Sequence, residues 1–262
     1  MLKLLNRIYN KIIHTVITDI SVLKYFFYKM KNSKKEKIFF FSDSRGWDIN
    51  DRLHRKDPFH FYLNSIIKKY NVDYFLCPEK HTTIIDFLRY YESSKKDYDY
   101  VILHAGVVDF SPRPVSNATE IYKKKRNDFD KFFSEEEMKN HFSKCFNILY
   151  EGEKTINIYP IDLACERIIP ELLKINNLIW INCNHFVKGW EGNYFKKRPE
   201  NINIVETYSS EFSSLMPLKV DLSKWTDDEV KKYTVDNIHF SRTGADLIVQ
   251  LIENQIENVR NK

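Results

Sequence analysis

The stretch that decides the fold is IFFFSDSRG, at residues 38–46. Its first four residues are apolar, and small, polar and charged residues follow directly. A short apolar run bounded by polar residues is typical of a strand that is buried on both faces of a parallel sheet. Ligands of such sheets bind beyond the carboxyl ends of the strands. The residues SDS at 42–44 therefore stand where we expect a functional site.

The rest of the chain repeats this alternation of short apolar runs and helical patterns. Strands alternating with helices predict an α/β fold of three layers, a flavodoxin-like parallel sheet between two layers of helices. Two polar, irregular segments, 110–135 and 185–200, predict lids or insertions around a site. Further strands are expected at 74–76, 100–103, 156–159, 178–181 and 202–205, and helices at 59–70, 83–91, 118–133, 135–150 and 242–259, with a capping box at Ser134 and Glu137 and an N-cap at Ser241.

Residues 2–27 precede this pattern and carry apolar side chains at helical spacing. A lysine cluster follows at residues 29–37. Two interpretations stay open: an amphipathic anchor whose lysines meet anionic lipid, or a helix that packs on its own domain or on a partner chain. We expect residues 1–35 to form an N-terminal amphipathic helical segment and residues 36–262 to form one α/β domain.

Composition limits the class of protein. Of the 262 residues, 43% are hydrophobic and 29% are charged, which excludes disordered and fibrous chains. The net charge of +5 is spread over the chain without a basic patch interleaved with aromatics, so we expect no nucleic-acid partner. No signal segment and no run of about 20 apolar residues occurs, which predicts a cytoplasmic protein, peripheral at the inner face of the membrane if the first helix is an anchor. Four cysteines without a CxxC pair predict free thiols: Cys77, Cys145, Cys165 and Cys183.

Polar residues with catalytic potential follow two strands and precede the last helix. HAGVVD, at residues 104–109, follows the strand expected at 100–103, and DNIH, at residues 236–239, precedes the last helix. An Asp three residues before a His in a tight turn can accept the Nδ1–H and fix the tautomer. The free Nε2 can then take the proton of a nearby hydroxyl. The sequence predicts a nucleophilic triad of Ser44, Asp236 and His239 suited to acyl transfer, with the Ser44 N–H facing the developing oxyanion.

Together these segments resemble the SGNH (GDSL-type) hydrolase superfamily over about residues 37–260. The family's Gly-Asp-Ser block is SDS at 42–44 here, its Gly-x-Asn-Asp block is GVVD at 106–109, and its Asp-x-x-His block is DNIH at 236–239. The resemblance implies a three-layer α/β/α fold and esterase or acyltransferase chemistry without a metal or another cofactor. It also assigns Asp43, Gly106 and Asp109 to the substrate and oxyanion region.

The chain departs from the family at the oxyanion hole, which is built from the serine N–H, a second-block glycine and the third-block Asn. Val108 stands in the place of that Asn, and no glycine lies between Gly46 and Gly106. Losing one such donor costs about 100- to 1000-fold in rate. Arg113 could supply a replacement charge, or anchor a sugar nucleotide or an anionic glycan, or simply pair with a neighbouring carboxylate.

Three functions remain open on the sequence. The first is a serine-dependent esterase, deacetylase or O-acyltransferase that acts on acylated sugars or a surface-polysaccharide precursor, so that the partner is a small molecule or a glycan. The second is a catalytically silent SGNH-like binding module in polysaccharide assembly. The third is a glycosyltransferase that uses the DxD motif at 128–130. The other histidines have no metal-ligand spacing and are expected to be solvated or hydrogen-bonded: His54, His60, His81, His141 and His185.

Overall fold

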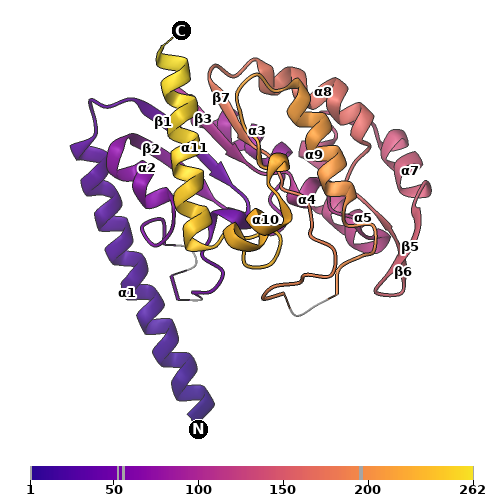
Figure 1. The fold of residues 1–262 in the computed structure, drawn as a ribbon, viewed down its shortest axis with the longest axis horizontal. Coiled ribbons are helices and arrows are strands. Elements are labelled where there is room, and N and C mark those ends of the chain that lie inside the picture. Colours follow the sequence, from indigo (N-terminus) through magenta and orange to yellow (C-terminus); the bar gives the residue numbers. More distant parts are fainter. Residues whose placement is uncertain (1, 52, 55–56, 195–196, 262) are drawn as a thin grey trace.

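A parallel sheet between two layers of helices forms the body of the protein (Figure 1). The computed structural model describes residues 2–51, 53–54, 57–194 and 197–261. The five strands follow the order β2-β1-β3-β7-β8, and every pair in the sheet is parallel. The expected α/β/α architecture is therefore confirmed. The strands are β1 Lys37–Ser42, β2 Asn71–Leu76, β3 Tyr100–His104, β7 Leu178–Ile181 and β8 Lys219–Val220.

The alternation of side chains along β1 divides the core between the two helical layers. Ile38 and Phe40 pack into the cluster formed with α2, α10 and α11, whereas Phe39 and Phe41 pack into the cluster formed with α3, α8 and α9. All four side chains are fully buried, as expected of a strand that is covered on both faces. These helices are α2 Leu63–Lys69, α3 Ile84–Ser94, α8 Ile161–Leu173, α9 Ile204–Leu215, α10 Asp227–Tyr233 and α11 Arg242–Arg260.

Two of the expected strands are wrong. The apolar run at 156–159 contributes only its first residue to a strand, β6 (Glu153–Ile156), which lies in a separate antiparallel sheet of order β4-β6-β5. Residues 202–205 lead into α9, where Val205 and Phe212, seven residues apart, are buried on one helical face. The short β8 forms the edge of the parallel sheet beside β7. The other strands of the small sheet are β4 Arg113–Pro114 and β5 Phe146–Tyr150.

Several helix boundaries also differ from the expectation. The helix expected at 118–133 is divided into α5 (Val115–Lys124) and α6 (Arg126–Phe129). The one expected at 135–150 ends as α7 (Glu135–Ser143), and β5 follows it. Both capping predictions are confirmed by hydrogen bonds, Glu137 N to Ser134 Oγ at 3.2 Å and Gly244 N to Ser241 Oγ at 3.1 Å. The remaining short elements are η1 Ser44–Gly46, α4 Val107–Phe110 and η2 Leu222–Lys224.

The N-terminal helix α1 (Leu2–Lys31) contacts the body through its C-terminal part and extends away from it toward the N-terminus (Figure 1). The Tyr25 hydroxyl donates to the Val72 carbonyl at 3.0 Å, and Lys29 Nζ lies 2.7 Å from Asp73 Oδ1. Asn32, just beyond the helix, donates to carbonyls at the end of α2. The side chains of residues 2–12 and 14 lie outside the described part. Among the helices that the structure describes, none combines the length and the apolarity needed to cross a bilayer.

Candidate active site

Ser44 lies at the carboxyl edge of the sheet, where β1 gives way to the single turn η1. The Asp43 N–H donates to the His104 carbonyl at 2.9 Å, which fixes the end of β1 against β3. The Asp43 side chain accepts the Arg45 N–H at 2.9 Å and so caps η1. These bonds hold the backbone on both sides of Ser44, and the Ser44 side chain remains partly exposed.

The Asp43 carboxylate forms a buried ion pair directly beneath this turn. Arg45 Nε lies 3.1 Å from Asp43 Oδ1, and Arg45 Nη2 lies 3.1 Å from Asp43 Oδ2. Both side chains are about 1% exposed. Burial opposes the charge of Arg45, but the neighbouring Asp43 raises the pKa of the guanidinium above its ordinary value. Arg45 also donates to the Asn182 carbonyl at 3.0 Å, so the pair ties the Ser44 turn to the end of β7.

The Asp236–His239 turn presents an imidazole in one defined orientation. Asp236 Oδ1 accepts the N–H groups of Ile238 at 3.1 Å and His239 at 2.8 Å. Asp236 Oδ2 lies 2.9 Å from His239 Nδ1. Burial would raise the pKa of Asp236, but the hydrogen bonds and charge of His239 hold that pKa below its ordinary value. The ionised carboxylate therefore fixes the proton on Nδ1 and leaves Nε2 as the acceptor.

The sheet brings this turn against the nucleophile. Ser44 Oγ lies 3.1 Å from His239 Nε2, although 195 positions of sequence separate the two residues. The contact expected between Ser44 and His239 is therefore present, and Asp236 completes the line from carboxylate through imidazole to hydroxyl. In such an arrangement the imidazole can take the hydroxyl proton as the serine oxygen attacks a carbonyl carbon.

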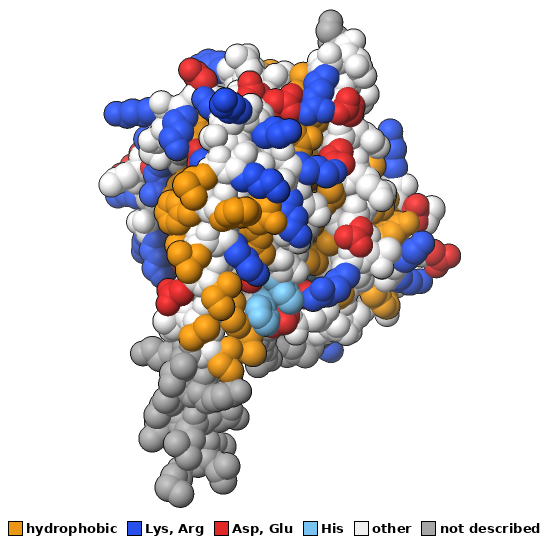
Figure 2. Space-filling model, turned by 90° about the vertical axis from the view of Figure 1, so that its left-hand side faces the viewer, with side chains coloured by type: hydrophobic (Ala, Val, Ile, Leu, Met, Phe, Trp, Pro, Cys, Tyr) orange, Lys and Arg blue, Asp and Glu red, His pale blue; other side chains and the backbone are white. Residues whose placement is uncertain are grey.

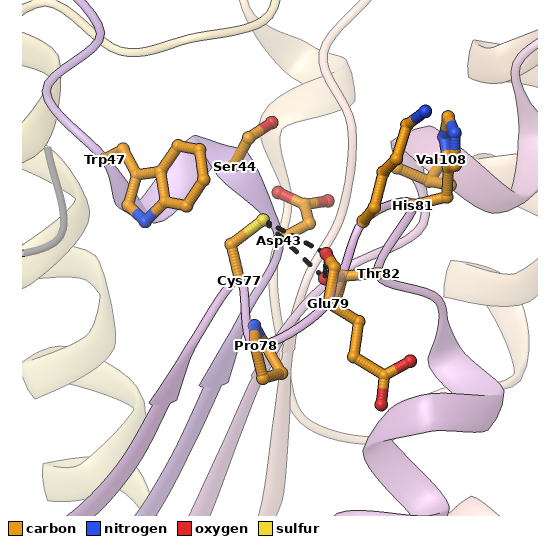
Figure 3. A pocket seen from close by; sticks show the side chains of 10 residues that line it. Asp43, Ser44, Trp47, Cys77, Pro78, Glu79, His81, Thr82 and Val108 are labelled. Atoms are coloured by element: carbon orange, nitrogen blue, oxygen red, sulfur yellow. Dashed lines mark hydrogen bonds between the residues drawn. The ribbon is translucent and has the colours of Figure 1, made fainter. Parts of the chain in front are cut away.

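A pocket of about 450 Å³ opens beside Ser44. Its volume falls in the range of small-molecule sites. In Figure 3, Trp47 stands on one side of Ser44, and His81 and Val108 stand on the other. The segment after β2 supplies most of the wall. The lining residues are Asp43, Ser44, Trp47, Cys77, Pro78, Glu79, Lys80, His81, Thr82 and Val108.

Positive charge surrounds the His81 side of this pocket. Burial, followed by the charges of Arg113, Lys80 and Lys125, lowers the pKa of His81 to about 4. His81 is therefore neutral at physiological pH. Of these cations, Lys125 is paired with Asp86 and Glu79, which leaves Lys80 and Arg113 as the main source of positive charge on this side. Lys80 is exposed and lines the pocket directly. Anionic or oxyanionic groups are favoured in such a field.

Backbone donors for an oxyanion are fewer than in the family pattern. Val108 lines the pocket with a side chain that cannot donate. The Cys77 N–H, at a backbone φ of +46°, donates to the Ser42 carbonyl at 2.6 Å, and Pro78 has no N–H. Within the described residues the Ser44 N–H has no acceptor, which leaves it available to a ligand. Of the three donors that the family resemblance implies, the described residues offer the serine N–H.

Gly106 and Asp109, expected near the substrate, lie behind the pocket wall. Gly106 precedes α4 at a φ of +122°, and a Cβ there would lie 3.0 Å from the Phe110 ring. Asp109 is fully buried and accepts the Ile84 N–H at 2.9 Å and the Tyr159 hydroxyl at 2.7 Å. Burial raises the pKa of Asp109 to about 6. These contacts anchor the start of α3 and do not reach the pocket lining.

Arg113 also lies behind the wall, where its guanidinium binds backbone carbonyls. It donates from Nη2 to Val108 and from Nε to Ser111 at 3.3 Å. Among the described residues its hydrogen-bond partners are these carbonyls, and the carboxylate pair that was one of its three possible roles is not found there. Burial lowers the pKa of Arg113 to about 10. The residue fastens the carbonyl end of α4 beside Val108.

Arg198 is a site residue that the sequence analysis missed. Its Nη2 donates to the Asp236 carbonyl, and its guanidinium stacks on Tyr194, 4.1 Å from the ring centroid, and on Phe186 at 5.2 Å. The side chain is only 8% exposed. The residue belongs to the 185–200 segment that was expected to be an insertion around the site, but no local motif marks it.

His104 lies beneath the catalytic edge and not in the pocket. Its Nδ1 is 2.7 Å from the Tyr62 hydroxyl, and its ring stacks on Phe240 with centroids 5.3 Å apart. Burial, together with the charges of Arg45 and His239, lowers the pKa of His104 well below its ordinary value. It is a neutral, buried support for the residue that follows His239.

The remaining motifs are held in local contacts. Arg89 Nε lies 3.2 Å from Asp128, and Arg126 Nε lies 3.2 Å from Asp130, so both carboxylates of the DxD motif are paired. Both carboxylates are thus bound by arginines in this structure, which gives the glycosyltransferase alternative no support. His141 is hydrogen-bonded as expected, to the Asn157 carbonyl at 3.1 Å. All four cysteines are free thiols.

Comparison with solved structures supports the fold. A lipase/acylhydrolase from Enterococcus faecalis shares 16% identity with this chain, with 85% of this chain and 96% of that chain covered and a TM-score of 0.50. An acetyl xylan esterase from Geobacillus stearothermophilus shares 13% identity, with 84% and 94% covered and a TM-score of 0.45. A scan against models of protein families gives no match, and neither does a search of curated proteins. At these identities the similarity to the first structure establishes a common fold, the SGNH-type fold that the sequence predicted.

Proposed function

We propose that this protein is a serine-dependent esterase or O-acyltransferase of SGNH type. The observation that carries the proposal is the line of contacts from Asp236 through His239 to Ser44 Oγ, which ends at the mouth of a pocket. The order of the three residues in the chain and the strand-to-turn setting of Ser44 agree with that chemistry. The fold shared with a lipase/acylhydrolase supports it.

The reaction follows from the geometry. Ser44 Oγ attacks the ester carbonyl carbon while His239 Nε2 takes the hydroxyl proton, and Asp236 stabilises the resulting imidazolium. The carbonyl oxygen becomes an oxyanion, which accepts the Ser44 N–H. Collapse of this intermediate breaks the bond to the alcohol, which leaves with the proton from His239. Water, or an acceptor hydroxyl, then attacks the acyl-serine by the same steps and releases an acid or a new ester.

Because few backbone N–H groups are available to the oxyanion, positive charge is its second source of stabilisation in this proposal. The Lys80 side chain lines the pocket, and Arg113 adds positive charge near His81, whereas Lys125 is paired with Asp86 and Glu79. A fixed positive field favours the oxyanion over the neutral carbonyl, although less directionally than an amide donor does. We therefore expect a slow or specialised enzyme.

We propose acylated sugars or a surface-polysaccharide precursor as the substrate class. Trp47 lies beside Ser44 at the pocket, where its indole ring can contact a sugar ring through its apolar face. The pocket admits a short acyl group. Hydrolysis and transfer share the acyl-serine intermediate, and competition between water and added sugar alcohols during turnover separates them.

The decisive experiment is the intact mass of the full chain after incubation with a fluorophosphonate probe. We expect one adduct on the native protein, none on Ser44→Ala, and slow or absent labelling of His239→Ala. The Ser223→Ala variant, which alters a serine at η2 away from the pocket, is the matched control and should be labelled like the native protein. Full labelling of Ser44→Ala would refute the serine mechanism.

The binding module is the second candidate, and the oxyanion region favours it. Val108 cannot donate, and the Cys77 N–H is already used by Ser42. A native protein that binds acylated sugars in calorimetry but never reacts with the probe would establish the silent module and exclude the enzyme.

We further propose that α1 is a peripheral contact with an anionic membrane surface. Figure 2 shows hydrophobic side chains gathered on the face beside the N-terminal segment, with basic side chains around them. Lys24, Lys31, Lys34 and Lys35 are exposed near this apolar surface and complement anionic headgroups. The exposed apolar residues of the helix are Val16, Ile20, Val22, Leu23, Phe26, Phe27 and Met30.

A further inference from the structure

A second cluster of chemistry-bearing side chains lies in the segment between η1 and α2. Asp51, His54 and His60 each offer one possible ligand atom, and these atoms lie within 4.8 Å of one another. Asp51 Oδ2 is 2.9 Å from His54 Nδ1 and 3.2 Å from His60 Nε2. The two imidazole rings stack with centroids 4.5 Å apart. Their side chains are between 20% and 33% exposed, so solvent ions reach the cluster.

The hydrogen bonds of Asp51 resemble those of Asp236 in the Asp236–His239 turn, but the group beside the imidazole differs. Asp51 Oδ1 accepts the N–H groups of Leu53 at 3.0 Å and His54 at 3.1 Å. In the catalytic turn the imidazole faces a serine hydroxyl. Here a second imidazole, His60, approaches the same carboxylate oxygen. Two imidazole nitrogens and one carboxylate oxygen therefore lie close together here.

We propose that Asp51, His54 and His60 bind a divalent transition-metal ion, with Zn²⁺ as the ion of best fit. Ligand atoms about 2.0–2.1 Å from a tetrahedral Zn²⁺ lie roughly 3.3 Å from one another, close to the separations of Asp51 Oδ2 from the two histidine nitrogens. Imidazole and carboxylate are a ligand set that zinc accepts. Asp48 Oδ2, 3.6 Å from His60 Nε2, or a water molecule completes the coordination. The expectation that His54 and His60 lack metal-ligand character, which rested on spacing alone, is revised by this proposal.

One cation of the protein competes for this position. Arg242 Nη2 lies 3.0 Å from Asp48 Oδ2 and 3.0 Å from His60 Nε2. The Arg242 side chain is 70% exposed, so it can turn into solvent when an ion enters. Asp48 and Asp51 carry two negative charges against this single guanidinium, which leaves the site electrostatically favourable to a divalent cation.

The site connects the two segments that carry the catalytic residues. Asp48 follows Trp47 and the Ser44 turn, His60 precedes α2, and Arg242 follows the His239 turn at the start of α11. A bound ion would link Asp51 and His54 to His60, which precedes α2. The proposal concerns metal binding and stands whether or not Ser44 is a nucleophile.

The test is isothermal calorimetry of Zn²⁺ with the full chain after chelator treatment. We expect one site in the native protein, and in His60→Ala a loss of affinity of at least about 10- to 100-fold, the loss that follows even from removing a hydrogen-bond partner of a ligand. His185→Ala is the matched control, because His185 forms a pair with Asp227 at 2.8 Å that lacks a second imidazole. Acidification from pH 7.5 to 6 should weaken binding, since protons compete for the imidazoles.

A second variant, Asp51→Asn, keeps the shape of the side chain and tests the site even if His60→Ala does not fold. It should also lose Zn²⁺ binding, while its circular dichroism spectrum stays unchanged. Co²⁺ in place of Zn²⁺ should give an absorption spectrum without a thiolate charge-transfer band, because the proposed ligands include no cysteine. Native-like affinity in both folded variants, loss of binding in His239→Ala, or no binding to the native protein would each overturn the proposal.

Discussion

Replacement of Asp109 by Asn should change the pH dependence of stability and leave the reaction of Ser44 intact. Asp109 is fully buried and accepts hydrogen bonds from Ile84 N and Tyr159 OH. The asparagine oxygen can accept both bonds. An oxyanion or substrate role for Asp109 would instead require the variant to lose activity.

The magnitude follows from the raised pKa of Asp109. Burial moves this pKa from 3.8 to about 6 in the folded protein. Between these values the folded state holds a proton that the unfolded chain has released. The stabilisation from that proton is complete below pH 3.8 and is lost as the pH rises through about 6. About two pKa units at 1.36 kcal/mol each amount to roughly 3 kcal/mol, which the neutral asparagine does not lose.

The assay is urea unfolding of both proteins in half-unit steps from pH 4 to 7.5. We expect the free energy of unfolding of Asp109→Asn, relative to the native protein, to rise by about 3 kcal/mol over that range. Asp221→Asn is the control of opposite sign, because the hydrogen bonds of Asp221 outweigh its burial and lower the pKa of its carboxyl group. Parallel stability curves for the native protein and Asp109→Asn would refute the reasoning, and unchanged fluorophosphonate labelling excludes an oxyanion role.

Three further predictions concern the triad, its support and the first helix. Asp236→Asn should lower the rate of Ser44 labelling by about 10⁴-fold, because the amide favours the wrong imidazole tautomer; labelling within tenfold of native would contradict the assignment. Arg198→Ala should reduce labelling less than Asp236→Asn does but should lower the melting temperature, because the stacking of Arg198 and its bond to the Asp236 carbonyl are both lost. Native labelling and a native melting temperature in this variant would exclude a role of Arg198 in holding the turn. Replacement of Leu23, Phe27 and Met30 by Glu retains the Tyr25 contacts and should leave the domain folded, with sedimentation on anionic vesicles lost and that of the native chain weakened by salt; equal sedimentation of both chains removes the membrane role.

The parts of the fold that sequence predicted are those whose signals are local. β1 is recognisable from four consecutive apolar residues, all of which are buried. The Asp236–His239 turn is recognisable because its hydrogen bonds join residues two and three positions apart. The N-cap of α11 at Ser241 is equally local, and Gly244 is required there because a Cβ would meet the Tyr233 carbonyl.

The wrong strand predictions concern short, mostly apolar segments whose secondary structure the sequence does not determine. Residues 156–159 and 202–205 resemble strands by length and composition, but four residues of which three are apolar fit a buried helix start or a core loop equally well. Ile158 and Tyr159 are fully buried without being in a strand, and Val205 is buried on α9. Tertiary packing decides such cases. The choice of β8 for the sheet edge depends on two residues, too few to give a periodic signal.

The support of the site was not predictable because its contacts join distant positions. Arg198 meets Asp236 38 residues further along the chain, and nothing in the segment 185–200 distinguishes this arginine from its basic neighbours. The contacts of Arg113 were also not predictable. A carboxylate pair is one of the three roles that the sequence allows for it, but in the structure its guanidinium binds the carbonyls of Val108 and Ser111.

Arg198 and Arg113 hold the two ends of the candidate site, the triad and the altered oxyanion region. The relay of Ser44, His239 and Asp236 is complete in geometry, and Arg198 restrains its acidic end. At the opposite end Val108 is fixed from behind by Arg113, so its side chain occupies the pocket wall where an amide donor would stand. The contacts of 3.1 Å and 2.9 Å within the triad agree with the proposed esterase or acyltransferase reaction. In that proposal the oxyanion relies on the Ser44 N–H and on the positive charge of Lys80, because Val108 supplies no side-chain donor.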